Sequence, residues 1–325
     1  MRAADQPVDP AATGWPARLH VVTGKGGTGK TSVAAALALA LASGGRRTLL
    51  IEVEGRQGIA QLFGTDPLPY EERHLADAPD GGEVRALAVD AEEALLEYLD
   101  MFYRLGAAGR ALRKFGAIDF ATTIAPGLRD VLLTGKAKEA TTRTVDQRRV
   151  YDAVVLDAPP TGRIGRFLNV TAETARLAKV GPIKTQSEGV AALLRSPITA
   201  VHVVTLLEEM PVQETVDAVA DLTSFGFPVG RIIVNGTRPP LPTGRVVSAA
   251  ELRRGLLAAG LPADREIVAG LHSEAHDQII RRELEDSLRA DLVELGLPMI
   301  ELPLLPDGVD RAGLSALAEA LRGAD

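Results

Sequence analysis

The chain of 325 residues contains no cysteine, few aromatic residues and no long apolar run. Without thiols it can form neither disulfides nor iron–sulfur clusters, nor a zinc site with cysteine ligands. Because only 4% of the residues are aromatic, aliphatic side chains must provide most of the core. No apolar stretch approaches the roughly 18 residues that a transmembrane helix needs, and the first residues lack the apolar segment of a secretory signal. These absences predict a cytoplasmic protein.

An excess of positive charge is also missing. Asp and Glu (43) outnumber Lys and Arg (36), which gives a net charge of −7. An acidic chain is a poor match for the phosphate backbone of a nucleic acid, so we expect no nucleic-acid partner. No internal repeat is visible, which predicts a single domain over residues 18–325. Residues 1–17 contain three prolines and no periodic pattern, which predicts a flexible N-terminal tail.

From Leu19 onward, apolar segments typical of strands alternate with segments typical of helices. This alternation predicts an α/β fold with a doubly wound, mostly parallel sheet and helices on both faces. Two mainly helical stretches, about 90–144 and 163–195, are broken at Pro126 and Pro182 and predict an inserted helical subdomain. The predicted strands are Leu19–Thr23, Thr48–Val53, Val84–Val89, Val150–Asp157, Ala200–Leu207, Arg231–Asn235 and Met299–Leu302.

A glycine-rich loop follows the first predicted strand and precedes a segment rich in Ala and Leu. It matches the phosphate-binding pattern G-x-x-x-x-G-K-[ST] at every defined position. Backbone N–H groups of such a loop surround phosphate oxygens, and the following helix N-terminus adds partial positive charge. Lys30 is predicted to reach the β- and γ-phosphates of a nucleoside triphosphate, and the Thr31 hydroxyl to coordinate Mg²⁺. The predicted nucleotide-binding residues of the loop are Gly24, Lys25, Gly26, Gly27, Thr28, Gly29, Lys30, Thr31 and Ser32.

A second apolar segment, Tyr151–Asp157, ends in a carboxylate, as a Walker B strand does. Hard cations prefer oxygen ligands, so Asp157 is predicted to hold Mg²⁺ through a water molecule. Thr31 and Asp157 are thus the predicted metal residues, with ATP and Mg²⁺ as the predicted ligands.

The lysine directly after the first glycine of the loop, Lys25, indicates which class of nucleotide-binding protein the chain resembles. The pattern G-K-G-G-x-G-K-[ST] resembles the deviant Walker A class of ATPases, which includes ArsA, the guided-entry targeting ATPases, MinD, ParA and the nitrogenase iron protein. That resemblance implies that Lys25 crosses a dimer interface and contacts the partner's nucleotide. It would then act as an arginine finger does in trans, a role worth about 10³–10⁵ in rate for GTPases. We therefore expect a homodimer or a heterodimer with a related ATPase chain; the alternative is that Lys25 is only a solvated loop residue.

The residues after Asp157 resemble the ArsA and guided-entry branch of this class. Its switch II motif is D-[TS]-A-P-T-G-H-T-L-R-[FL]-L, and this chain has Arg163 where the family usually has histidine. The alternative is a surface turn rich in Pro and Gly. The residues shared with the motif, which we predict to form switch II, are Asp157, Pro160, Thr161, Gly162 and Arg166, followed by Leu168.

Two further segments resemble the same branch. Asn235 ends a segment similar to the family's "VVN" strand, whose asparagine contacts the adenine edge. An amide side chain offers adenine both a donor and an acceptor, although Asn235 could instead be a residue of a strand-end turn. Pro306 and Asp307 belong to a P-L-L-P loop like the one that covers the base in the family. The resemblance thus extends from residue 19 to about 321.

Switch I departs from the family pattern. The family has S-T-D-P-A-H-S after the second strand, and its aspartate orients or activates the attacking water. Here the aligned residues begin Glu52-Val53-Glu54-Gly55, so Glu54 takes the aspartate's place as the predicted catalytic carboxylate, beside Lys25. One added methylene moves a carboxylate by about 1 Å, a displacement that can cost about 10² in rate. Gly55 in place of proline would allow the backbone to compensate. We expect slow hydrolysis.

The cysteine-dependent metal sites known in the family cannot form in this chain. ArsA senses arsenite through cysteine thiolates, and many guided-entry dimers share a C-x-x-C zinc site; a chain without cysteine can have neither. His272 and His276 have a spacing that could ligate zinc on a helix, but the many charged neighbours favour a solvated helix face, so no zinc site is predicted.

Two apolar helical segments are candidates for a client-binding face. They are Glu92–Leu105 and Gly189–Leu194. The simpler interpretation is that both belong to the core. The other is that they bind a hydrophobic client or a membrane-protein segment, although only four methionines are available for an adaptable groove.

The function that follows is a dimeric ArsA-like ATPase whose nucleotide state switches a helical subdomain that binds a client or partner. Loss of the γ-phosphate would release switch residues 52–58 and 157–166. One alternative is a positioning ATPase of the MinD or ParA type, which would need a cationic amphipathic helix; the C-terminal segment is apolar-periodic but not cationic. Another is an ATP-dependent binding module with little or no catalysis.

Overall fold

The computed structural model describes residues 14–90, 92–97, 126–169, 182–239 and 247–323. Its centre is an eight-stranded sheet in which every neighbouring pair is parallel except β3 and β4. The predicted doubly wound α/β fold is therefore confirmed. In spatial order the strands are β10 (Met299–Pro303), β9 (Val229–Thr237), β8 (Thr199–Thr205), β1 (Leu19–Gly24), β7 (Ala153–Asp157), β2 (Arg47–Glu52), β4 (Gly82–Ala88) and β3 (Arg73–Ala78).

All seven predicted strands are present, with boundaries that differ by one to three residues. The largest difference is at β7, which begins at Ala153 rather than at Val150. Strand β3 was not predicted, because an antiparallel edge strand with a polar sequence carries no continuous apolar run. The short hairpin of β5 (Thr144–Val145) and β6 (Arg148–Arg149) was not predicted either, since the sequence there resembles a helix end.

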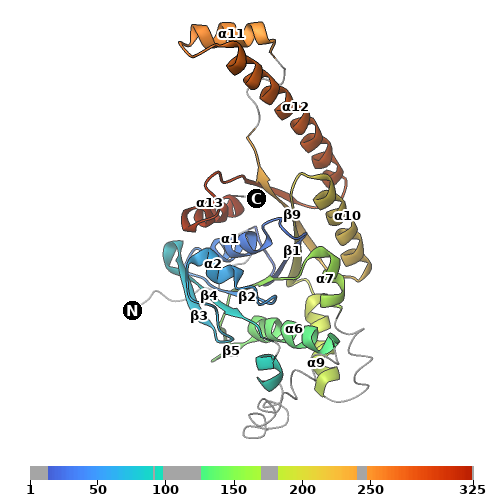
Figure 1. Ribbon diagram of the computed structural model, residues 1–325. Helices are drawn as coiled ribbons and strands as arrows, with labels where there is room; N and C mark the ends of the chain where they lie inside the picture. Colours follow the sequence, from blue (N-terminus) through green and yellow to red (C-terminus); the bar gives the residue numbers. More distant parts are fainter. Residues whose placement is uncertain (1–13, 91, 98–125, 170–181, 240–246, 324–325) are drawn as a thin grey trace.

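Helices cover both faces of the sheet (Figure 1). One layer packs its buried side chains in a core with Val22, Leu50 and Val155 of the strands. The other layer packs against Val21, Leu49 and Leu156, the neighbours that point the opposite way. The first layer is α1 (Lys30–Ala42), α2 (Gly58–Phe63) and α13 (Arg311–Arg322), and the second is α6 (Pro126–Thr142), α7 (Thr161–Leu168), α9 (Pro182–Leu194) and α10 (Glu209–Ser224).

Helix α1 is apolar all around and is buried between the sheet and α13. Its Ala and Leu residues are strong helix formers, and the small alanines let the helix lie close to both neighbours. Helix α13 places Leu314, Leu317 and Leu321 in this same core. The apolar face of the C-terminal helix is therefore covered by the rest of the protein.

The described parts of the predicted helical subdomain form the second layer of the sheet rather than a body that rises from it. Helices α6 and α9 begin at Pro126 and Pro182, the two predicted breaks, because proline suits the first turn of a helix. Leu95, Val190 and Leu194 are buried in the core with the strands, as the simpler interpretation of the two apolar segments predicted. Residues 98–125 and 170–181, which complete those stretches, lie outside the described residues.

The N-terminal residues closest to the sheet are packed, not loose. Trp15 is buried, and its indole Nε1 donates a hydrogen bond to the carbonyl of Leu321 at 3.1 Å. Its ring lies edge-on to His20 of β1 and His202 of β8. The predicted tail of residues 1–17 thus extends too far, since residues 14–17 belong to the domain; residues 1–13 lie outside the described residues.

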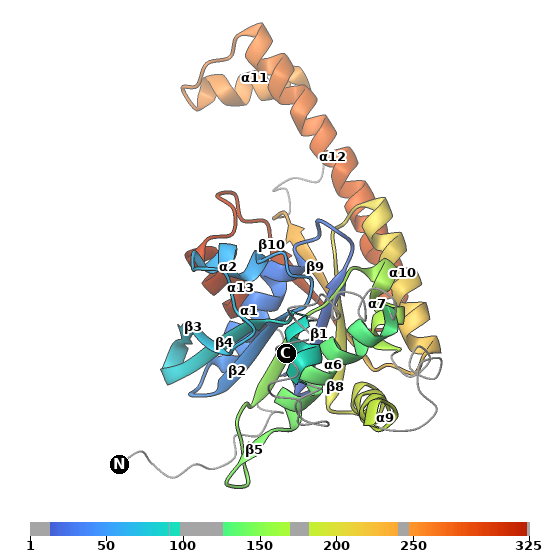
Figure 2. The ribbon, with the colours of Figure 1, turned by 60° about the horizontal axis from the view of Figure 1, so that its bottom comes forward.

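Two helices form an arm, which we define as α11 (Ala249–Ala258) and α12 (Arg265–Val293). The C-terminal part of α12 packs on the sheet edge, where Leu288 and Leu292 contact the core around Ile232 and Val234. The remainder extends away from the body (Figures 1 and 2). Across the described residues, none of the helices combines the length and the apolar character that crossing a membrane requires.

The sequence predicted a helix at His272–His276, which lies within α12, but it did not predict the arm. A signal was present in the capping box at the start of α11. There Ser248 accepts from the backbone of Glu251, whose carboxylate accepts from the backbone of Ser248. In addition, η2 (Pro79–Gly81), a short 3₁₀ turn, joins β3 to β4.

Candidate active site

The phosphate-binding loop joins the carboxyl end of β1 to the N-terminus of α1. Two glycines are required by close approach: a Cβ on Gly24 would lie 2.2 Å from the carbonyl oxygen of Val204, and one on Gly29 would lie 2.4 Å from the amide nitrogen of Asn235. Gly29 also has a φ of 86°, which a side chain would oppose. The buried Thr28 closes the loop by donating from its hydroxyl to the carbonyl of Lys25 at 2.9 Å. The two glycines that the sequence pattern requires, Gly24 and Gly29, are therefore also positions where packing leaves no room for a side chain.

The first turn of α1 points its free backbone N–H groups towards the loop, since helix N-termini lack intrahelical acceptors for them. Lys30, Thr31 and Ser32 are the first three residues of this helix. Gly26 and Gly27 are exposed on the loop, with open space where their Cβ atoms would be. This combination of N–H groups and a lysine suits the phosphates of a nucleotide.

Thr31 and Asp157, far apart in the sequence, meet directly. The Thr31 hydroxyl donates to Oδ2 of Asp157 at 2.8 Å. Strands β1 and β7 are neighbours in register up to Val22 and Asp157, so the carboxylate arrives beside the loop. The sequence predicted both as metal residues, and the fold brings them together.

A third polar group at this point, Glu52, was missed by sequence reasoning. It ends β2, where it is paired in register with Asp157 of β7, and it is only 2% exposed. Its Oε2 accepts from the backbone of Ile59 at 3.1 Å, whereas its Oε1 is buried without a hydrogen-bond partner. The family pattern indicated Glu54, two residues further along, as the equivalent of the aspartate, so Glu52 was not predicted.

These carboxylates leave the site short of positive charge. Burial raises the pKa of Asp157 to about 7; the Thr31 hydroxyl and Lys30 oppose that rise, whereas Glu52 and Glu54 add to it. A divalent cation would supply the missing charge, and the unpartnered Oε1 of Glu52 indicates the same deficit. Within the described residues no three His, Asp or Glu side chains group to hold a metal by themselves. The donors therefore fit Mg²⁺, which usually takes one or two carboxylates, water and substrate phosphates.

In switch I, Glu54 is 18% exposed and lies near Arg56, with 3.9 Å between Oε2 and Nε. Gly55 has a φ of 67°. Proline is confined to a φ near −65°, so the family's proline could not adopt this backbone. Gln57, also at positive φ, stabilises the turn by bonding with both of its amide atoms to the backbone of Leu68. The switch I backbone therefore departs from the family pattern together with its carboxylate.

Switch II leaves β7 at Asp157 and enters α7 at Thr161. Pro160 is the N-cap of α7, and Thr23 donates from its hydroxyl to the carbonyl of Pro159 at 2.7 Å. Gly162 and Arg166 are exposed on α7. The predicted switch II residues are thus contiguous in space, and α7 begins within the switch.

Lys25 forms an ion pair inside its own chain. Its Nζ lies 3.0 Å from Oε1 of Glu214 on α10, and the Thr161 hydroxyl donates to the other oxygen of the same carboxylate at 2.9 Å. Glu214 was not among the predicted site residues. Only the path of the chain brings α10 beside the loop, so no local pattern could have indicated it.

On the other side of the loop, Asn235 lies within β9 and not in a strand-end turn. Its amide nitrogen donates to the carbonyl of Thr28 at 2.9 Å, so in this structure it supports the phosphate-binding loop. Asn235 and Leu304 of the P-L-L-P loop line a cavity of about 670 Å³, within the usual size range of ligand sites. Pro306 and Asp307 are exposed in the turn at the end of this loop.

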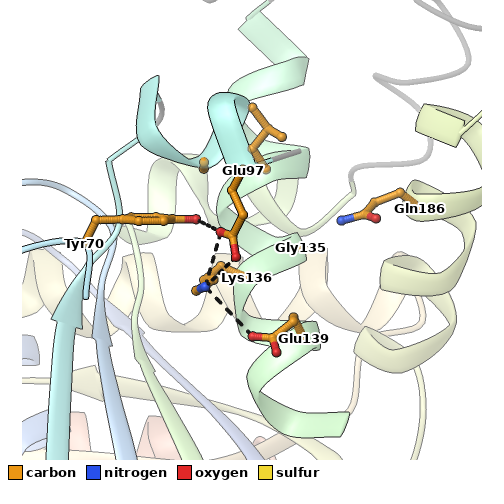
Figure 3. A pocket seen from close by; sticks show the side chains of 8 residues that line it. Tyr70, Glu97, Gly135, Lys136, Glu139 and Gln186 are labelled. Carbon is orange, nitrogen blue, oxygen red and sulfur yellow. Dashed lines mark hydrogen bonds and ion pairs between the residues drawn. The ribbon is translucent and has the colours of Figure 1, made fainter. Parts of the chain in front are cut away.

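A second cavity is lined by α6 together with Tyr70, Glu97 and Gln186 (Figure 3). It has about 40 Å³, room for water rather than for a substrate. Lys136 lies between two carboxylates there, with its Nζ 3.0 Å from Glu97 and 3.9 Å from Glu139. The Tyr70 hydroxyl donates to Glu97 as well. This is an internal ion-pair network, not a candidate active site.

Comparisons with known proteins agree with the geometry. The family model for the anion-transporting ATPase (ArsA) matches residues 17–194, which include the loop, both switches and α9. The chain is 54% identical over 326 aligned residues to ATPase BagA of Mycobacterium tuberculosis, with 96% of each chain covered. It is 26% identical to ATPase GET3 of Kluyveromyces lactis, over 66% of this chain and 70% of that one. With the arsenical pump-driving ATPase of Escherichia coli it shares 25% identity, over 78% of this chain and 45% of the other.

Proposed function

This chain belongs to the anion-transporting ATPase (ArsA) family, and from that premise we propose that it is a slow, Mg²⁺-dependent ATPase that works as a dimer and uses ATP as a conformational switch. The observation that carries the proposal is the hydrogen bond from Thr31 to Asp157. It joins the phosphate-binding loop to the acidic strand end, the arrangement needed to hold a metal ion against nucleotide phosphates.

The chain's own residues take the following roles in this proposal. Lys30 and the N–H groups of the loop bind the phosphates, and Thr31 and Asp157 hold the metal ion. Bound there, Mg²⁺ would neutralise charge on the phosphate oxygens. Asn235 orders the loop from behind and, with the cavity beside it, provides the place for the base.

Glu54 would orient the attacking water, and Lys25 of a partner chain would stabilise charge that develops during cleavage. The positive φ of Gly55 supports a rearranged switch I, which agrees with slow rather than absent hydrolysis. The partner is a second copy or a related ATPase chain.

The switch acts on the helices that contact it. Helix α7 starts inside switch II and packs against α10, so a change at Asp157–Pro160 would move the second helical layer first. The proposed result is nucleotide-dependent binding of a hydrophobic client or partner by the helical side of the molecule.

Turnover of ATP by the purified chain tests this proposal. We expect Mg²⁺-dependent release of phosphate that falls about 10³-fold or more in Lys25→Ala and also falls in Glu54→Ala. Lys184→Ala is the matched control, because Lys184 is an exposed lysine paired with Glu188 on α9, away from the loop. It should behave as the unchanged chain does.

Equal turnover in the unchanged chain and in Lys25→Ala would refute a trans-acting dimer. Tight ATP binding with no turnover in any variant would instead favour a binding module without catalysis. A positioning ATPase is less well supported, because the apolar face of α13 is buried against α1 and is not free for a membrane.

A further inference from the structure

The signature lysine of the loop is occupied within its own chain. Its ammonium is 3.0 Å from Glu214, and both side chains are only partly exposed, at 29% and 35%. The pKa of Glu214 is lowered: its slight burial would raise it, but the hydrogen bonds from Lys25 and Thr161 outweigh that effect. This ion pair competes with any contact between Lys25 and a second chain.

The same carboxylate also binds switch II. Thr161, the first residue of α7, donates to the oxygen of Glu214 that Lys25 does not contact. One side chain of α10 therefore connects the loop to the switch segment that follows Asp157. A displacement of Thr161 would remove one of the two contacts that orient this carboxylate.

We propose that Glu214 is a positioning residue that holds Lys25 in cis and releases it when switch II moves. The inference deepens the proposed function, on which it rests, by adding a gate before dimer engagement. In the resting chain Lys25 is bound to Glu214. When switch II rearranges around a bound nucleotide, Thr161 leaves the carboxylate, the ion pair loosens and Lys25 becomes free to reach the partner's phosphates.

The geometry limits the strength of this gate. A partly exposed ion pair has a modest effect, which corresponds to about 2–5-fold in an equilibrium. That is weak enough for a nucleotide phosphate to displace it, yet large enough to delay engagement at low protein concentration. Salt should weaken the gate because the pair is accessible to ions.

The direct test measures the reactivity of Lys25 in dilute, nucleotide-free protein with an acetylating reagent, followed by mass spectrometry. The reagent must reach the amine, and the ion pair with Glu214 keeps that amine engaged within the chain. We expect Glu214→Gln to raise the acetylation rate of Lys25 about 2–5-fold. Thr161→Val should raise it less, since the ion pair remains. Asp221→Asn, which removes a charge from an exposed position on the same helix two turns away, should leave it unchanged.

An unchanged rate in Glu214→Gln, or an equal rise in Asp221→Asn, would overturn the inference. A second measurement follows turnover against protein concentration, where Glu214→Gln should reach half of its maximal rate at about 2–5-fold lower concentration. If Glu214→Gln needed a higher protein concentration than the unchanged chain to reach half of its maximal rate, the proposal would also be contradicted. The labelling needs neither turnover nor a dimer, so the cis restraint can be supported even if Lys25→Ala refutes the proposed function.

Discussion

Two groups of carboxylates in this protein, one buried and one partly exposed, differ in where their counter-charge comes from. Beside the phosphate-binding loop, Glu52 and Asp157 lie next to one another, with one buried oxygen unpartnered. Under α6, Glu72 accepts hydrogen bonds from Arg143 and from Tyr151, the latter at 2.6 Å. The first group lacks sufficient positive charge within the chain, whereas Glu72 in the second has it.

The pKa values express this difference. Burial raises the pKa of Asp157 to about 7. Burial would also raise the pKa of Glu72, but hydrogen bonds from Arg143 and Tyr151 hold it below its usual value. Lys136 lies between Glu97 and Glu139 in the second network (Figure 3), where burial raises the pKa of Glu139 although Arg143 and Lys136 oppose that rise. A carboxylate that the fold leaves short of charge is suited to an external cation, and one that the fold satisfies is suited to hold helices in place.

The largest expected effect comes from neutralising the first group. Asp157→Asn should lower Mg²⁺-dependent ATP turnover by at least about 10²-fold, because a metal ligand is lost. The same change should raise the thermal stability of the nucleotide-free chain, because it removes a buried charge with no adequate partner. Phosphate release and thermal unfolding would measure the two effects.

Asp152→Asn is the control for this comparison, since Asp152 is exposed at the other end of the same strand and bonds the backbone of Arg47. It should not raise stability or remove turnover. A loss of stability in Asp157→Asn would mean that the first group is satisfied within the chain after all.

The second group should respond in the opposite sense. Glu72→Ala would leave Arg143 and Tyr151 without their shared acceptor, so we expect a loss of about 2–3 kcal/mol in the free energy of unfolding. Urea denaturation measures it, with the exposed neighbour Glu71→Ala as control. Turnover per folded molecule should be retained; a neutral Glu72→Ala would show that the network adds no stability.

An effect on stability that depends on pH is expected from the buried pair His20 and His202, which is satisfied only when neutral. The backbone of Arg231 donates to Nδ1 of His202, and His20 Nε2 bonds the carbonyl of Ala17. A backbone N–H can only donate and a carbonyl can only accept. His202 Nε2 therefore donates to His20 Nδ1, 3.0 Å away. No site in this chain of bonds can take an extra proton.

Burial lowers the pKa of His20 to about 4, and burial with the neighbouring charges lowers that of His202 well below its usual value. Between about pH 6.5 and the folded pKa values, the unfolded chain binds more protons than the folded one. The free energy of unfolding should therefore decrease as the pH is lowered below about 6.5, by at most about 1.4 kcal/mol per pH unit for each histidine.

Urea denaturation at pH 7.5 and 5.5 checks this dependence, and His74→Asn, which removes an exposed imidazole, should leave it intact. Nitrogen NMR of the rings gives an independent measurement. A second ring proton on His20 or His202 above pH 6 in the folded chain would contradict the assignment of both rings as neutral.

Much of the candidate site was predictable because its signals are local. Gly24, Gly29 and Thr31 lie within eight consecutive residues of the loop and the start of α1, and glycine is recognisable where a backbone must approach another chain segment closely. Asp157 was recognisable because it ends an apolar strand. Glu52, Glu214 and the arm were missed. All three depend on how distant elements pack. Glu52 has a buried oxygen without a partner, Glu214 pairs with a lysine 189 positions away, and the arm contains a long helix that extends from the body.

By itself the sequence determined the alternation of strands and helices, and it predicted the phosphate-binding loop and switch II, because these depend on periodicity and on short runs of residues. Only the tertiary structure decided that Thr31 meets Asp157, that Asn235 supports the loop, and that Lys25 is held by Glu214 of its own chain. Each of these contacts joins segments separated by more than a hundred residues. The order of strands in the sheet brings them together, and no local pattern encodes that order.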